Sequence, residues 1–128
     1  MNSESKKEKM DKVAMQIILH AGDAKCHTEE ALSLLKTFSF EEAEKKMELA
    51  KKELTLAHAS QTELIQDEAR GTQYPNNLLF NHSQDTLMTS MTFYDTALQL
   101  LPIVKAIYSQ SSNKKTVDSL SNGENSHE

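Results

Sequence analysis

The sequence has no tryptophan, two prolines and only three glycines among its 128 residues. Proline and glycine disfavour helix interiors, whereas the plentiful Ala, Leu, Glu, Lys, Gln and Met residues favour them. This composition predicts an all-α protein. A chain of this length is expected to form one domain around one modest core.

Cysteine is almost absent, since Cys26 is the only one. An internal disulfide is therefore excluded, and without a partner at metal-ligand spacing we expect an inert intracellular thiol that serves in packing. No apolar run approaches the roughly 20 residues of a membrane-spanning helix. The first seven residues also lack the apolar core of a signal peptide. We therefore expect a cytoplasmic protein without direct membrane insertion.

Basic residues are in the minority, with 14 Lys and Arg against 19 Asp and Glu and a formal net charge of −5. This balance argues against a nucleic-acid-binding protein and suits a partner with a basic face. The sequence also lacks a Gly-rich phosphate loop, an HExxH motif, paired cysteines and a serine nucleophile motif. Ordinary hydrolases and nucleotide-binding proteins are therefore not indicated.

Apolar and small residues recur at alternating spacings of three and four in two segments, which indicates two amphipathic helices. The first stripe is Met10, Ala14, Ile17, Ala21, Ala24, Thr28, Ala31 and Leu35, and the second is Phe40, Ala43, Met47, Ala50, Leu54, Ala57, Gln61 and Leu64. Residues 36–39 predict the break between them, and Ser39 and Glu42 have the spacing of a capping box. Gly22, between Ala21 and Asp23, predicts a close approach of another backbone.

The turn-forming residues of segment 70–77 predict a loop, in which Asn76 or Asn77 caps a third helix that begins near Leu78. This helix carries two stripes on opposite faces. The apolar stripe is Leu87, Met91, Tyr94, Leu98, Leu101 and Tyr108, and the polar stripe is His82, Asp85, Thr89, Thr92, Thr96 and Gln99. Pro102 is expected to kink or loosen the helix.

Together these elements predict an antiparallel up-down-up bundle of three helices over residues 9–110. Residues 1–8 are expected to be a flexible N-terminus. Residues 111–128 are rich in Ser, Asn, Lys and Gly and have little to bury, so a disordered polar tail is expected there. The polar stripe either lines a wet axis between copies of the helix or is an ordinary solvated face. Solvated faces elsewhere in the chain consist of Glu and Lys, which favours the axis.

Among the residue types present, histidine is the best candidate for a catalytic role. His82 falls in the first turns of the third helix, where free N–H groups and the helix dipole favour an anion and a neutral imidazole. A neutral imidazole can attack phosphorus, so a phosphohistidine can form there. Asp85 lies on the same face and can orient the ring or hold a divalent cation, although such a pair is more often an ordinary surface pair. His20, His27 and His127 are expected to be solvated surface residues.

Three collinear segments resemble the lactose/cellobiose enzyme IIA family of bacterial sugar phosphotransferase systems. Residues 81–91, NHSQDTLMTSM, resemble the family's His-x-Gln-Asp-His-Leu-Met-Thr motif. Residues 21–24, AGDA, and residues 57–62, AHASQT, resemble its Ala-Gly-Asp-Ala and Ala-His-x-x-Gln-Thr signatures. The resemblance covers roughly residues 9 to 110.

This resemblance implies a homotrimer, a bundle of nine helices, in which His82 accepts a phosphoryl group from the phosphohistidine carrier protein. The group then passes to the cysteine of the cognate enzyme IIB during uptake of a β-linked disaccharide. Asp85 is implied to hold Mg²⁺, one ion per trimer, on the threefold axis. Gln84, His58 and Gln61 are implied as candidates for positioning phosphate, and helix packing is the alternative for His58.

The sequence departs from the family pattern at Thr86, where the family usually has a second histidine. An alternative interpretation is therefore a helical regulatory or interaction protein on the same trimeric scaffold that transfers no phosphate. A metal-storage or metal-sensing bundle would need more carboxylate and histidine ligands than His82 and Asp85 supply. The sequence does not distinguish cellobiose, lactose, chitobiose and aryl glucosides.

Overall fold

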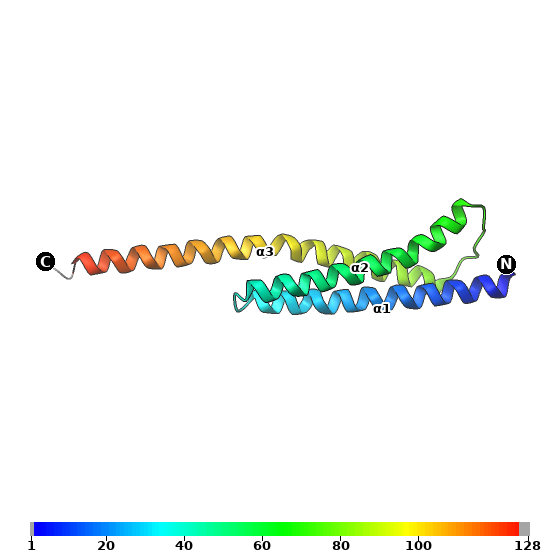
Figure 1. Cartoon of the computed structure of the whole chain (residues 1–128), viewed down its shortest axis with the longest axis horizontal. Coiled ribbons are helices and arrows are strands. Elements are labelled where there is room, and N and C mark those ends of the chain that lie inside the picture. The colour runs from blue at the N-terminus through cyan, green and yellow to red at the C-terminus, as the bar shows by residue number, and fades with distance from the viewer. Residues whose placement is uncertain (1, 126–128) are drawn as a thin grey trace.

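The computed structural model describes the backbone of residues 2–125 and the side chains of residues 2–114 and of Leu120. This part of the chain forms three helices, α1 (Ser3–Leu35), α2 (Phe40–Ala69) and α3 (Leu78–Asn125). They run up, down and up, with α3 continuing alone past the end of the α1–α2 pair (Figure 1). The predicted all-α, antiparallel three-helix architecture is confirmed.

The core is organised around α1, on which both other helices pack, whereas α2 and α3 touch each other much less. All eight residues of the stripe predicted on α1 are buried, together with Val13. On α2 the predicted stripe is also buried, except that Phe40 and Gln61 are half-buried. Because α3 contacts α1 along only one side, its opposite side remains uncovered within the chain.

The apolar stripe predicted on α3 is wrong in part. Leu98 and Tyr108 are 48% and 43% exposed, and the inner face is built largely of small residues. The residues that face the core are Ser83, Leu87, Ser90, Tyr94, Ala97 and Leu101. Small residues were overlooked because a hydrophobic pattern does not register serine, yet serine fits where helices approach closely.

The predicted start of the first helix and the predicted cap of the second differ from the structure. α1 begins at Ser3, within the segment expected to be flexible, because the Asn2 side chain accepts a hydrogen bond from the Ser5 N–H at 2.7 Å. Ser39 precedes α2, but its side chain forms no capping hydrogen bond and instead contacts the Thr37 hydroxyl at 3.0 Å. The predicted capping box is therefore wrong, although the break at residues 36–39 is confirmed.

The predicted disordered tail also differs from the structure, in which α3 is helical through Asn125. Adding residues to an existing helix is far easier than nucleating a new one, so the helix continues from the packed segment even through Ser and Asn. It also continues through Pro102 without interruption. Residues 126–128 of the predicted tail lie outside the described residues.

The described helices include none that is both long and apolar enough to cross a membrane.

Candidate functional site

The start of α3 is fixed by Asn77. Its Oδ1 accepts a hydrogen bond from the Phe80 N–H at 2.9 Å, and its Nδ2 donates to Asp11 Oδ1 of α1 at 3.0 Å. The second bond lowers the pKa of the Asp11 carboxyl, because donation from the amide favours the charged form. Asn77 therefore caps α3, as one of the two predicted candidates, and also ties its first turn to α1.

The loop before α3 is held by Asp67, near the end of α2. Its carboxylate accepts hydrogen bonds from the Lys9 ammonium at 2.7 Å and from the Tyr74 hydroxyl at 2.5 Å. These two donors lower the pKa of Asp67, and the two carboxylates of Asp67 and Glu63 raise the pKa of Lys9. One acidic side chain thus joins α1, α2 and the loop at the end of the bundle where α3 begins.

His82 lies on the outer side of this anchored first segment of α3. Its neighbour Ser83 is fully buried and donates a hydrogen bond to the Phe80 carbonyl at 2.6 Å, and Leu87 is 1% exposed. Since these two side chains face the core, the helix directs His82 to the exterior, where it is exposed. Among the described residues, no hydrogen bond or ion pair engages the imidazole. The ring is therefore accessible to another molecule.

Asp85 is exposed on the same side of α3, three residues from His82. That spacing turns it about 60° around the helix from His82. Thr86, the residue that departs from the family motif, is half-buried, and its hydroxyl donates to the His82 carbonyl oxygen at 3.0 Å. This hydroxyl therefore interacts with the backbone of His82.

Gln84 faces a different part of the surface. It lines a half-open cleft of about 410 Å³ between the start of α3, the preceding loop, α1 and the end of α2. The other lining residues are Met10, Leu64, Ile65, Glu68, Tyr74, Pro75, Asn76, Asn77, Phe80 and Asn81. Sequence reasoning did not group these residues, because they come from three helices and a loop and share no motif.

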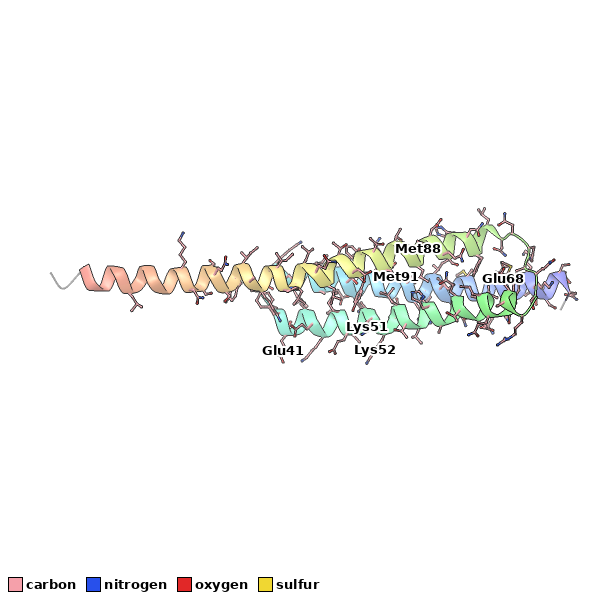
Figure 2. All side chains as sticks on the ribbon, turned by 90° about the horizontal axis from the view of Figure 1, so that it is seen from above. Glu41, Lys51, Lys52, Glu68, Met88 and Met91 are labelled. Atoms are coloured by element: carbon pink, nitrogen blue, oxygen red, sulfur yellow. The ribbon has the colours of Figure 1, made fainter. Side chains whose placement is uncertain are left out.

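The structure does not bring His58 and Gln61 to His82 within one chain. His58 Nε2 lies 3.0 Å from Met91 Sδ on α3. Met91 is nine residues beyond His82, which is about 13.5 Å along the helix and on the opposite side of it. Figure 2 shows Met88 and Met91 on α3, with Lys51 and Lys52 on the neighbouring α2. Gln61 is half-buried on α2, one turn from His58.

His20 and His27, predicted to be solvated surface residues, are both half-buried. His20 pairs with Glu53 across α1 and α2 at 2.7 Å, and the Nδ1 atom of His27 is buried without a hydrogen-bond partner. His127 lies outside the described residues. Cys26, expected in packing, is exposed instead. None of these side chains lies at the start of α3.

A metal ion would find few ligands in a single chain. Within the described residues, no group of three His, Cys, Asp or Glu side chains is placed to hold one. Asp85 offers one exposed carboxylate, a hard oxygen ligand of the type that Mg²⁺ prefers. The donor type fits the expected ion, and copies of Asp85 from other chains would be needed to build a site of several protein ligands.

Comparison with known proteins places this geometry in context. Residues 12–105 match the family described as "PTS system, Lactose/Cellobiose specific IIA subunit". The lichenan-specific phosphotransferase enzyme IIA component of Bacillus subtilis is 42% identical over 103 residues, which cover 80% of this chain and 94% of that protein. The lactose-specific EIIA component of Lacticaseibacillus casei is 32% identical, covering 79% of this chain and 90% of that protein.

Two solved structures share the fold. The crystal structure of PtcA from S. mutans superposes with a TM-score of 0.75 at 35% identity, covering 82% of this chain and 99% of that one. The crystal structure of the cellobiose-specific enzyme IIA from Bacillus anthracis gives a TM-score of 0.75 at 35% identity. The match covers 78% of this chain and 92% of that one. The family match ends at residue 105, whereas α3 continues to Asn125.

Proposed function

This chain belongs to the lactose/cellobiose-specific IIA family of the sugar phosphotransferase system, and from that premise we propose that it relays a phosphoryl group on His82. The donor is the phosphohistidine carrier protein, and the acceptor is the cysteine of the cognate enzyme IIB. The relay serves uptake of a β-linked disaccharide and takes place in the cytoplasm. The observation that carries this proposal is the exposed, unengaged imidazole of His82 on a rigidly anchored helix start.

In the first step, a ring nitrogen lone pair of neutral His82 attacks the phosphorus of the donor phosphohistidine. A P–N bond forms on His82 as the P–N bond of the donor breaks, and the donor imidazole leaves with that electron pair. The two phosphohistidines are chemically alike, so the transfer is nearly isoenergetic. The proteins contribute positioning and electrostatics. The exposed ring meets the need for direct access by the donor.

In the second step, the thiolate of the IIB cysteine attacks the phosphorus on His82. The P–N bond breaks, its electron pair returns to the imidazole, and a P–S bond forms on the partner. No sugar pocket is required on this chain, because the sugar receives phosphate only later. Specificity then lies in transient docking of two protein partners on the surface around His82.

The surface beside His82 suits such docking. Leu78, one helical turn before His82, is 84% exposed, whereas Leu79 is half-buried and Phe80 packs against the core. The apolar surface beside His82 therefore consists mainly of Leu78, with Leu79 at its edge. The net charge of −5 favours a donor with a basic face.

We further propose that three copies assemble through the uncovered side of α3. Asp85 from each chain then faces the threefold axis, where the three carboxylates would hold one Mg²⁺ together with water. The bound cation would neutralise the repulsion among the carboxylates. His82, about 60° around the helix from Asp85, lies toward the rim of this interface. In this trimer, His58 and Gln61 of one chain lie near His82 of a neighbouring chain. Gln84 orients the phosphoryl group from the cleft that adjoins His82.

The test is a relay experiment with phosphoenolpyruvate, the general carrier enzymes and the cognate IIB. We expect the chain to gain one phosphoryl group and to lose it when IIB is added. His82→Gln removes the gain, while the control His20→Gln still accepts phosphate, because His20 pairs with Glu53 between α1 and α2 and does not lie at the start of α3. A wild-type chain that stays unmodified contradicts the proposal and supports a regulatory protein that transfers no phosphate.

A further inference from the structure

A polar contact joins the beginning of α1 to the beginning of α3, at the end of the bundle that carries His82. Asp11 Oδ1 on α1 accepts a hydrogen bond from Asn77 Nδ2 at 3.0 Å, and Asp11 Oδ2 lies 3.4 Å from Lys7 Nζ. Figure 1 shows the two helix starts at the same end of the molecule. Asp11 precedes the family match, which begins at residue 12, and belongs to none of the three signature segments. The family resemblance therefore assigns no role to this carboxylate.

Asp11 occupies a fixed place on α1. Its neighbours Met10 and Val13 are buried in the core, and Asp11 itself is half-buried. The packed helix therefore presents the carboxylate to Asn77 as a stationary group. The hydrogen bond from Asn77 lowers the pKa of Asp11, which keeps it ionised at neutral pH. An ionised carboxylate can accept hydrogen bonds and cannot donate them.

The amide of Asn77 has two different ends, and only one of them can cap α3. Oδ1 accepts a hydrogen bond from the Phe80 N–H at 2.9 Å, whereas Nδ2 would meet that N–H as a second donor. Turning the amide by half a turn would lose the cap and would also place Oδ1 against the carboxylate of Asp11. Because Asp11 only accepts, it selects the orientation in which Oδ1 faces the helix.

His82 follows directly on the turn that Asn77 fixes. Asn77 accepts the N–H of Phe80 through its side chain and the N–H of Asn81 through its main-chain carbonyl, at 3.0 Å. The Phe80 carbonyl in turn accepts a hydrogen bond from the Ser83 hydroxyl at 2.6 Å. These bonds hold the backbone on both sides of His82. The imidazole itself has no hydrogen bond within the described residues, so its position depends on this backbone.

We propose that Asp11 is a positioning residue for phosphoryl transfer, which acts through the Asn77 amide to hold the first turn of α3 and with it the imidazole of His82. This inference rests on the proposed relay at His82. Asp11 bonds to Asn77 and Lys7 and not to the imidazole. Its effect should therefore appear in the rate of transfer within the docked complex, because displacing a reacting group by about 1 Å can cost about a hundredfold in rate.

Rapid mixing of the phosphorylated carrier protein with an excess of this chain tests the proposal. The measured quantities are the limiting rate of phosphoryl transfer and the concentration of chain that gives half that rate. Asp11→Leu has no acceptor and should lower the limiting rate by at least about tenfold, with the half-saturating concentration unchanged. Asp11→Asn keeps an oxygen acceptor and should stay near wild type. Glu8→Leu, at an exposed carboxylate three residues earlier on α1, is the control and should match wild type.

An exchanged pair provides a second test, which does not depend on whether Asp11→Leu folds. Asn77→Asp keeps an oxygen that can cap α3 but places a second carboxylate against Asp11, so the two repel each other. In the double variant Asp11→Asn/Asn77→Asp, the amide at position 11 can donate to the carboxylate at position 77. We expect the single variant to be slow and the double variant to recover most of the wild-type rate. Exchange of the Phe80 amide hydrogen, followed by NMR, should be faster in the slow variants than in wild type.

The outcomes separate this inference from the proposed function. A wild-type chain that accepts no phosphoryl group contradicts the relay, and this inference with it. A phosphorylated wild type with an equally fast Asp11→Leu, or an exchanged pair as slow as Asn77→Asp, overturns the positioning role and leaves the relay intact. A raised half-saturating concentration at an unchanged limiting rate also overturns it, because Asp11 would then belong to the docking surface.

Discussion

At the scale of single residues, the accessibility of His82 is decided by its neighbours. Ser83 and Leu87 are buried, so the helix has one orientation about its axis and His82 must point outward. Asn77 fixes where that helix starts. The imidazole is thus presented at the surface by the packing of Ser83 and Leu87 and by the cap at Asn77.

Thr86 offers a test of the departure from the family motif. Its hydroxyl donates to the His82 carbonyl oxygen at 3.0 Å. Removing the hydroxyl in Thr86→Ala should therefore leave the extent of phosphorylation unchanged, because the backbone carbonyl keeps its helical hydrogen bond. The measurement is the phosphorylated fraction after reaction with the carrier protein. A strongly reduced fraction in a folded variant would show that Thr86 takes part in transfer.

Asp67 contributes to the loss of folding stability that we expect at acidic pH. The hydrogen bonds from Lys9 and Tyr74 lower its pKa below the ordinary 3.8. A carboxyl with a lowered pKa in the folded state contributes stability that is fully present above the unfolded pKa and is lost as pH falls through the folded value. We therefore expect Asp67→Asn to be less stable than wild type at neutral pH, with a smaller further loss on acidification.

The measurement is the thermal midpoint at steps from about pH 6 to about pH 2. Asp11 and Glu30 also have lowered pKa values, from Asn77 and from Lys46 respectively, so a residual acid response remains in the variant. Glu68→Gln, at an exposed carboxyl next to Asp67, is the control and should follow the wild-type curve. Identical curves for Asp67→Asn and wild type would exclude the anchor at the loop.

At the scale of elements, the effect of a glycine on stability can be compared at two positions, Gly22 inside α1 and Gly71 in the loop after α2. A Cβ added at either position meets no atom within 4 Å, so no backbone of the same chain makes the close approach that was predicted at Gly22. Gly22 is inside α1, where Ala is favoured by about 1 kcal/mol. Gly71 has φ of 101°, where a side chain is strained. Gly22→Ala should raise the free energy of unfolding by about 1 kcal/mol, and Gly71→Ala should lower it.

Denaturant unfolding of the two glycine variants gives both free energies under one protocol. A loss of stability in Gly22→Ala would show that a surface outside the single chain packs against this position. That result would direct attention to the subunit interface of the proposed trimer.

The elements also show how far the sequence predicts the structure. The stripes of α1 and α2 were predictable because their apolar residues repeat at helical spacing. The inner face of α3 was not, since Ser83, Ser90 and Ala97 are small and carry little hydrophobic signal. The motif predicted where His82 and Asp85 lie, but it could not show that His58 contacts Met91, because that contact depends on the register between two helices.

The prediction of a disordered tail at the end of α3 differs from the structure for another reason. Residues after Ser111 are polar and, taken alone, favour disorder. The helix nevertheless continues to Asn125, because each added residue extends a helix that is already formed and packed. Local composition does not report this contribution from the preceding segment.

At the scale of the whole molecule, the proposed Mg²⁺ site ties metal binding at Asp85 to assembly of the proposed trimer. If three Asp85 carboxylates share one Mg²⁺, a chelator should weaken the wild-type trimer, because the unneutralised carboxylates repel one another. Asp85→Leu removes the charges, so its trimer should persist with or without chelator. Native mass spectrometry with and without EDTA is the measurement.

Asp95→Leu, at another exposed aspartate of α3, is the matched control and should remain sensitive to chelator. A monomer in both wild type and Asp85→Leu, or the same chelator response in both, would contradict a shared axial metal.

The central claim is that His82 is the residue that carries the phosphoryl group. Locating that group on the chain tests the claim most directly. The wild-type chain is phosphorylated through the carrier protein, digested under alkaline conditions that preserve phosphohistidine, and analysed by tandem mass spectrometry. The account predicts one phosphoryl group, on the peptide containing His82 and on that residue. A phosphoryl group on His20, His27 or His58, or none on any histidine, would contradict it.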